Sequence, residues 1–152
     1  MGEIDLSIIL RLVAAVVAGG VLGLSRDLAE QPIGMRTLAL VSLGAASVSI
    51  AVLRQVDVIH HADAASRVLQ GVVQGLMVGV GFIGAGVILR DTSTNRVHGL
   101  TTATTVWVTA ALGIACALGE WLVVGAGLVL ALLILIVLKR FERRVSPQLE
   151  KH

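Results

Sequence analysis

Charged residues are scarce in this sequence. Asp, Glu, Lys and Arg together make up 14% of its 152 residues, whereas a soluble domain carries about 25%. Hydrophobic residues make up 56%, and many of them lie in long uncharged runs. The shortage of charge excludes an ordinary soluble domain. The uncharged runs indicate a polytopic membrane protein with one domain.

Other features are missing as well. The only cysteine, Cys116, lies inside an apolar run, which excludes an intramolecular disulfide and argues against a redox role. The first apolar run follows Glu3 and Asp5 rather than basic residues, so we expect no removable signal peptide. The sequence places no nucleophile beside a base and an orienting group, so we expect neither enzymatic activity nor a cofactor.

Five apolar runs are long enough to be membrane-spanning helices. They predict an all-α fold with five transmembrane helices, at residues 4–24, 37–53, 68–89, 100–118 and 121–138. The second and fifth runs are short, so those helices must stand upright or borrow flanking residues. We expect residues 1–140 to form the transmembrane domain and residues 141–152 to form a basic cytoplasmic tail.

The placement of Lys and Arg predicts the orientation. With the N-terminus outside, nine basic residues fall on the inner side and two, Arg54 and Arg67, on the outer side. The positive-inside rule then favours an outer N-terminus and a cytoplasmic C-terminus. The inner set consists of Arg26, Arg36, Arg90, Arg96, Lys139, Arg140, Arg143, Arg144 and Lys151.

The third run is rich in glycine, with six glycines between positions 71 and 86. Each would cost a soluble helix about 1 kcal/mol relative to alanine, but in a membrane glycine lets helices make backbone contact. We therefore predict a central third helix that packs against the first and fourth helices and supports a homodimer. Four of the glycines share one face and two lie nearly opposite; the six are Gly71, Gly75, Gly79, Gly86, Gly81 and Gly84.

Residues 79–84 of the same run match the pattern G-x-G-x-x-G. A dinucleotide site needs a strand before this pattern and an acidic residue about 20 positions after it. Here the pattern lies within an apolar run and position 104 is a threonine. Helix packing is therefore favoured over nucleotide binding, and a local helix break that lines a cavity is the alternative.

Threonines gather in the first half of the fourth run. Thr102, Thr105 and Thr109 share a face, and Thr101 and Thr104 lie to one side of it. Threonine hydroxyls in membrane helices bond to their own helix or to a neighbouring helix. Packing against the glycine-rich helix is the favoured interpretation, and a hydroxyl-lined path or ligand pocket is the alternative.

Arg11 is a charged residue inside the first run, and such a residue needs a partner or access to water. Snorkelling to the outer headgroups is the favoured interpretation. The alternatives are an ion pair with Glu3, Asp63 or Glu120, and a substrate or ion site.

Charges of both signs occur in two connectors that we place on the inner side. Residues 25–36 carry Arg26, Asp27 and Arg36, and residues 90–99 begin with Arg90. These charges are either simply solvated or paired, or they form a cytoplasmic recognition surface. On the outer side, His60 and His61 are adjacent and point apart, so we expect no metal site there.

Three stretches resemble the MgtC/SapB family of bacterial inner-membrane proteins: residues 23–27 with 34–37, the segment GFIGAGVI at 81–88, and VHGLTTA at 97–103 with WVTAA at 107–111. The resemblance covers most of residues 11–119 and implies a five-span domain with an outer N-terminus. The family residues that map here are Arg26, Gly34, Arg36, Thr37, Asp63, Arg67, Gly81, Gly84, Gly86, Gly99, Thr101, Thr102, Trp107 and Thr109.

The chain departs from the family pattern at several points. The usual L-E-R-E reads Leu24-Ser25-Arg26-Asp27, and the usual R-T-H ends in Leu38. About four extra residues, one helical turn, separate Arg67 from the segment at 81–88. We expect the soluble C-terminal domain of longer family members to be absent.

The resemblance implies an association with growth at low magnesium, with survival inside host cells, and with restraint of the ATP synthase. We therefore favour a regulatory or interaction protein of the inner membrane, whose partners are the bilayer, a second copy and a membrane complex such as the ATP synthase, and no nucleic acid. A cation or solute transporter using Arg11, Asp63 and residues 101–109 is the rival. A third hypothesis is an anion or lipid-headgroup module held by the inner arginines.

Overall fold

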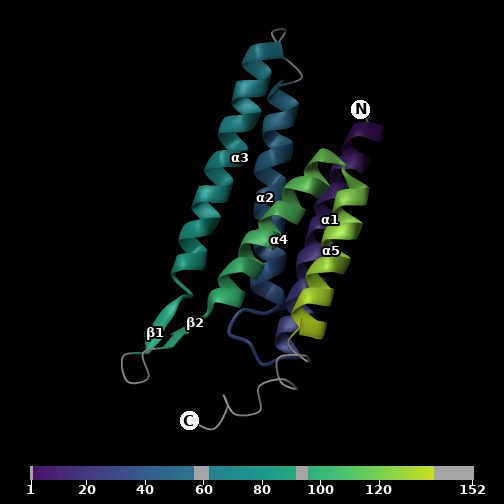
Figure 1. Ribbon diagram of the computed structural model, residues 1–152. Coiled ribbons are helices and arrows are strands. Elements are labelled where there is room, and N and C mark those ends of the chain that lie inside the picture. The colour runs from purple at the N-terminus through teal and green to yellow at the C-terminus, as the bar shows by residue number, and fades with distance from the viewer. Residues whose placement is uncertain (1, 57–61, 92–95, 139–152) are drawn as a thin grey trace.

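The computed structural model describes residues 2–56, 62–91 and 96–138, and within these it contains five α-helices and one short hairpin (Figure 1). The helices are α1 (Gly2–Asp27), α2 (Met35–Val56), α3 (Ala62–Ala85), α4 (Leu100–Leu118) and α5 (Trp121–Leu133), and α5 continues as the π-helical turn η1 (Ile134–Leu138). The hairpin pairs β1 (Leu89–Asp91) with β2 (Arg96–His98) in antiparallel register. The helical fold class is confirmed, with this hairpin as an addition.

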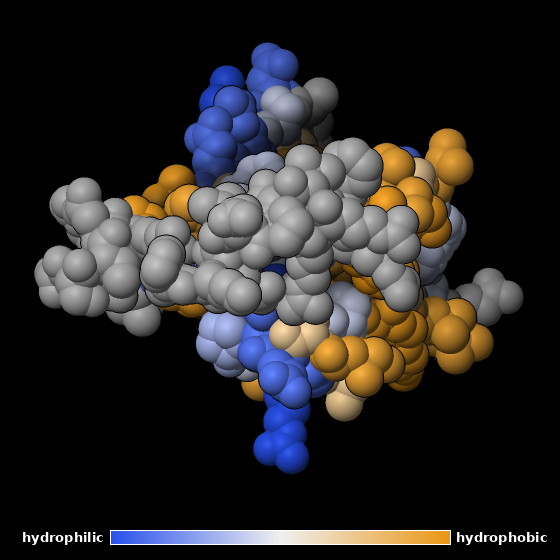
Figure 2. Space-filling view, turned by 60° about the horizontal axis from the view of Figure 1, so that its bottom comes forward, coloured by the Kyte–Doolittle hydropathy of each residue, from blue (hydrophilic) through white to orange (hydrophobic). Residues whose placement is uncertain are grey.

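Four of the helices, α1 to α4, are long and apolar enough to cross a membrane, and α5 with η1 forms a shorter apolar helix. Large hydrophobic side chains remain exposed along all five helices. Figure 2 shows such residues along the flanks of the bundle, where a membrane protein meets lipid. The chain is therefore a membrane protein, while the fifth span and the orientation stay predictions.

The third helix differs from the prediction at both ends. It begins at Ala62, so Asp63 and Arg67 belong to its first two turns rather than to a loop. A carboxylate in the first turn of a helix, here that of Asp63, interacts favourably with the positive end of the helix dipole. This interaction explains why the helix begins earlier than predicted. The helix ends at Ala85, and the N–H of Gly86 still bonds to the Phe82 carbonyl at 3.1 Å. The residues that follow Ala85 are still apolar. The prediction used hydropathy alone, and it therefore extended the helix to residue 89.

The central helix of the bundle is α4, not α3. It packs against α1, α2, α3 and α5, and 61% of its span is buried, against 11% for α3. Among the described residues, α3 packs against α2 and α4 but has no extended contact with α1 (Figure 1). The prediction of a central third helix was wrong. Glycine allows a neighbouring helix to approach closely, but glycine alone does not determine that a neighbouring helix is there.

The glycines that do bring helices together lie elsewhere. A Cβ atom at Gly19 of α1 would lie 2.5 Å from the Leu38 carbonyl oxygen of α2, and one at Gly113 of α4 would collide with the Ser42 carbonyl. Gly23 likewise lies against the backbone of Met35. Helices α1, α2 and α4 therefore meet backbone to backbone and form the tightly packed centre of the bundle.

Candidate functional site

Arg26 occupies the last turn of α1 and is buried, with 5% of its surface exposed. Its Nη2 donates to the side-chain oxygen of Gln31 at 3.2 Å and to the hydroxyl of Thr102 in the first turn of α4. Its Nε is buried without an acceptor. The guanidinium thus joins the end of α1, the following turn and the start of α4. We call Arg26, Gln31 and Thr102 the arginine junction.

The turn after α1 positions Gln31. The N–H of Gln31 bonds to the Arg26 carbonyl at 3.1 Å, and the N–H of Glu30 bonds to the Asp27 carbonyl at 3.0 Å. This pair of bonds is the Schellman ending of a helix, which places its C′ residue in the left-handed region and favours glycine there. Here the C′ residue is Glu30, with φ of 54°. The turn brings the Gln31 side chain back toward Arg26.

Asp27 caps the next helix. Its carboxylate accepts a hydrogen bond from the N–H of Met35, the first residue of α2, at 2.9 Å. A Cβ at Gly34 would collide with the same carboxylate, so a side chain at position 34 would displace Asp27 from its capping position. The carboxylate also faces the positive end of the α2 dipole. The two family residues Asp27 and Gly34 therefore set the angle between α1 and α2.

The start of α4 depends on Gly99. This residue has φ of 89°, and its carbonyl accepts the N–H of Ala103 at 2.8 Å. A Cβ at Gly99 would collide with the Val87 carbonyl, so glycine is required for both conformation and space. As the N-cap residue, Gly99 has no side chain that could cap this end of α4. Gly99 therefore turns the chain from the hairpin into α4 and places Thr102 beside Arg26.

The threonine hydroxyls of α4 bond mainly within their own helix. Thr105 donates to the Thr101 carbonyl at 2.7 Å, and Thr109 donates to the Thr105 carbonyl at 2.8 Å. Both side chains are buried, as is Thr102. On the side toward α3, a Cβ at Gly84 would lie 3.5 Å from the Ala103 Cβ, so Ala103 rather than a threonine packs against that glycine. The threonine face therefore belongs to the packed centre, with Thr102 as its link to α1.

A small cavity of about 100 Å³ lies between α1, α4 and the end of α5. Hydroxyl-bearing residues line one side of it and apolar residues line the rest. The lining residues are Leu22, Thr101, Thr104, Thr105, Val108, Ala131, Ile134 and Leu135. Because Leu22 lies one turn before Arg26 on α1, this cavity is next to the arginine junction.

Arg11 caps the far end of α4. Its Nη1 donates to the Ala117 carbonyl at 2.6 Å, and a Cβ at Gly119 would come within 3.2 Å of its Nη2. The last carbonyls of a helix lack partners within the helix and carry negative partial charge, so a guanidinium stabilises them. Arg11 therefore bonds to the backbone at the end of α4, a contact that was not considered from the sequence. Snorkelling and an ion pair stay predictions, and the Glu3 side chain lies outside what the structure describes.

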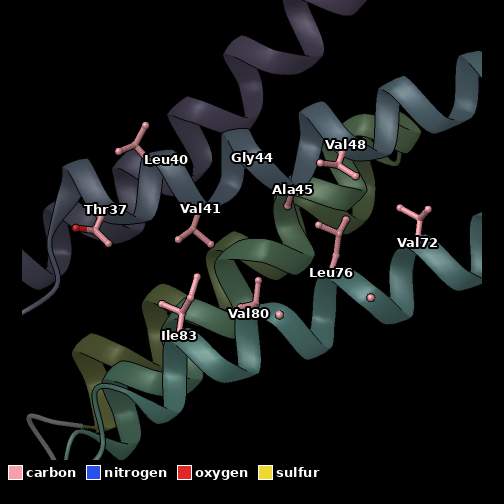
Figure 3. A pocket seen from close by; sticks show the side chains of 12 residues that line it. Thr37, Leu40, Val41, Gly44, Ala45, Val48, Val72, Leu76, Val80 and Ile83 are labelled. Atoms are coloured by element: carbon pink, nitrogen blue, oxygen red, sulfur yellow. The ribbon is translucent and has the colours of Figure 1, made fainter.

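An open apolar groove runs between α2 and α3 (Figure 3). Its volume is about 850 Å³, and Thr37, at one end, is its only lining residue with a polar side chain. A Cβ at Gly44, Gly75 or Gly79 would meet nothing within 4 Å, so these glycines leave helix backbone bare in the groove. The lining residues are Thr37, Leu40, Val41, Gly44, Ala45, Val48, Val72, Gly75, Leu76, Gly79, Val80 and Ile83. We call this feature the α2–α3 groove.

The predicted site residues do not form one cluster. Asp63 and Arg67 lie on α3 at the end of the bundle opposite to Arg26 (Figure 1). Exposed residues among the others are Asp27, Arg36, Thr37, Gly81, Gly86, Thr101 and Trp107. The Arg90 side chain, His60, His61 and the tail at 141–152 lie outside what the structure describes. Within the described ranges, no three His, Cys, Asp or Glu side chains are grouped closely enough to hold a metal ion.

Sequence reasoning missed Gln31, the packing glycines and the α2–α3 groove. Gly19 and Gly23 are four residues apart on one helix face, and this small-xxx-small spacing was the available signal for the packing glycines. Gln31 gave no such signal, because its role depends on the conformation of the turn. The groove arises from the outward lean of α3, which no local pattern encodes.

Comparisons with known proteins show which family the sequence matches. The sequence model of the MgtC family matches residues 12–144. Protein SrpB of Synechococcus elongatus is 41% identical over 140 residues, which cover 88% of this chain and 75% of SrpB. Protein MgtC of Salmonella typhimurium is 34% identical over 138 residues, which cover 91% of this chain and 55% of MgtC.

Protein SapB of Bacillus subtilis is 32% identical over 147 residues, which cover 95% of this chain and 62% of SapB. The chain thus spans between half and two thirds of the lengths of MgtC and SapB. No solved structure matches it. The family match covers nearly all of the described helices, and the chain belongs to the MgtC family.

Proposed function

We propose that this protein is an interaction protein of the bacterial inner membrane, and that it binds a transmembrane helix of a partner in the α2–α3 groove. The single observation that carries this proposal is the groove itself, which is apolar and open on one side. The family resemblance connects the role with growth at low magnesium and with virulence. It also suggests a regulated membrane complex such as the ATP synthase as the partner.

The groove has the features that helix association in a membrane needs. Lipid is as apolar as leucine, so transmembrane helices associate through close packing at small residues. Gly75 and Gly79 are four residues apart on α3, and Gly44 opens the facing side on α2. A partner helix can therefore approach two helix backbones at once. A second copy of this chain, presenting its own α3, is one such partner and would give the homodimer.

Transport receives less support. Thr105 and Thr109 use their hydroxyls on carbonyls of their own helix, and α4 packs closely against α1 and α2. The face that would line a route is therefore occupied by packing.

Placement in the membrane is part of the proposal. Residues 121–138 would be about 27 Å long as a helix, close to a bilayer core of about 30 Å, so we infer a fifth span. The basic residues then favour an outer N-terminus and an inner C-terminus, as in the sequence-based count. The arginine junction would lie at the cytoplasmic surface.

Affinity purification from native membranes tests the proposal. Gly75→Leu and Gly79→Leu place side chains in the groove, and we expect both to remove the partner from the purified complex. Gly81→Leu and Gly125→Leu are matched controls, because each site also has open space but lies outside the groove, Gly81 on nearly the opposite face of α3. We expect these controls to keep the partner. Equal recovery of partner from all four variants would show that the groove is not the binding surface.

A further inference from the structure

The guanidinium of Arg26 is a buried cation with neutral neighbours. Its two hydrogen-bond acceptors are the Gln31 amide oxygen and the Thr102 hydroxyl. The adjacent carboxylate, Asp27, accepts the N–H of Met35. Arginine does not lose its proton, and a buried charge without a counter-charge is costly. The arginine junction therefore lacks negative charge among the described residues.

Several hydrogen-bond donors remain unused at the same place. Nη2 makes both of the recorded bonds, whereas Nε is buried without an acceptor and Nη1 donates to no described residue. The Thr102 hydroxyl accepts from Arg26, and its own hydrogen donates to no described residue. These donors belong to two helices, α1 and α4, that meet at the junction.

The start of α4 adds positive potential. This helix runs for 19 residues from Leu100, and Thr102 lies in its first turn. The first N–H groups of a helix have no partner within the helix, and they attract anions together with the helix dipole. The N-cap residue of α4, Gly99, has no side chain that could supply that negative partner. The buried arginine and the helix start thus favour the same kind of ligand.

We propose that the arginine junction binds a phosphate group, with Arg26 and Thr102 as the donors. A phosphate has acceptor oxygens in several directions, which suits donors from two helices, and arginine matches phosphate geometry. The group belongs either to a lipid headgroup or to a free phosphate. This site is separate from the α2–α3 groove and does not depend on the proposed function.

Thermal unfolding of the purified full-length chain in dodecyl maltoside tests this site. Inorganic phosphate is titrated against chloride at equal ionic strength. At ten times the dissociation constant, we expect phosphate to raise the Tm by about 3 °C. Arg26→Gln should abolish this rise. Arg36→Gln, which removes an exposed arginine at the same end of the bundle, should retain it.

A second titration distinguishes the two sources of phosphate. Phosphatidylglycerol is added to the micelles and compared with monogalactosyl diacylglycerol, which has no phosphate. A rise in Tm with phosphatidylglycerol alone, lost in Arg26→Gln, assigns the site to a lipid headgroup. A rise with inorganic phosphate, lost in the same variant, assigns it to a free phosphate.

The proposal is overturned if the wild-type chain responds to neither phosphate source, or if Arg26→Gln responds as the wild type does. Should Arg26→Gln not fold, Thr102→Val decides the question. It keeps the guanidinium and removes one donor, and we expect it to need at least threefold more phosphate for the same rise. An unchanged response in Thr102→Val would then refute the site.

Discussion

Arg26 and Thr102 are joined by a hydrogen bond although 76 positions separate them in the sequence. The bond connects the last turn of α1 to the first turn of α4, where the two helices meet at one end of the bundle. The two residues thereby hold α1, its following turn and α4 together.

Thr102→Val should destabilise the protein by about 2 kcal/mol, because the buried guanidinium loses an acceptor and gains no replacement. Thr101→Val is the matched control, since Thr101 is exposed, and it should change stability by less than about 0.5 kcal/mol. The measurement is the free energy of unfolding in mixed micelles as SDS is titrated. Similar losses in the two variants would mean that the Arg26 bond contributes little.

Gly113→Ala should destabilise by about 2 kcal/mol, because the added methyl group collides with the Ser42 carbonyl and pushes α4 away from α2. Gly125→Ala adds the same methyl group where nothing lies within 4 Å. There the better helix propensity of alanine should leave stability unchanged or raise it by up to about 1 kcal/mol. The same SDS titration compares them, and a tolerated Gly113→Ala would disprove the close α2–α4 packing.

Arg11→Gln should cost about 2 kcal/mol, because the charged hydrogen bond to the Ala117 carbonyl is lost at the end of α4. Arg67→Gln removes an exposed arginine from α3 and should have little effect on stability. Amide hydrogen exchange offers a local check. Exchange should accelerate in the last turn of α4 in Arg11→Gln only, and equal protection in both variants would rule out the capping role.

Glu30→Gly should stabilise the protein by about 1 kcal/mol, because glycine adopts the left-handed region without the cost that a side chain brings. Glu30→Ala removes the same carboxylate but keeps a Cβ, so it should bring no gain. The comparison uses Tm in dodecyl maltoside. A gain of equal size in both variants would assign the effect to charge rather than to backbone conformation.

Hydropathy and glycine predicted much of the fold, to different degrees in different helices. The predicted fourth helix, 100–118, matches α4 residue for residue, because Gly99 and Gly119 both adopt positive φ and end the helix sharply. The third helix was displaced, because its apolar composition continues beyond the turn that follows Ala85. Hydropathy reports which residues avoid water, and it does not report where helical hydrogen bonding stops.

The candidate site was predicted in its residues but not in its contacts. Arg26 and Thr102 were both singled out through the family resemblance, yet no local pattern indicates that they meet. Arg11 was recognised as a charge in need of a partner. Its partner is a backbone carbonyl, and because every residue has one, the sequence does not indicate which carbonyl is involved. Contacts of this kind depend on how α1, α2 and α4 pack together, and that packing involves distant glycines such as Gly113, which lies against Ser42 of α2.

Photo-crosslinking in native membranes tests the proposed docking groove most directly. A benzoylphenylalanine is placed at Leu40, which lines the α2–α3 groove, or at Leu122 of α5, which is exposed elsewhere on the bundle. We predict one dominant protein adduct from position 40, either the partner or a second copy, and little protein adduct from position 122. Protein adducts of equal yield from both positions, or none from position 40, would contradict the account.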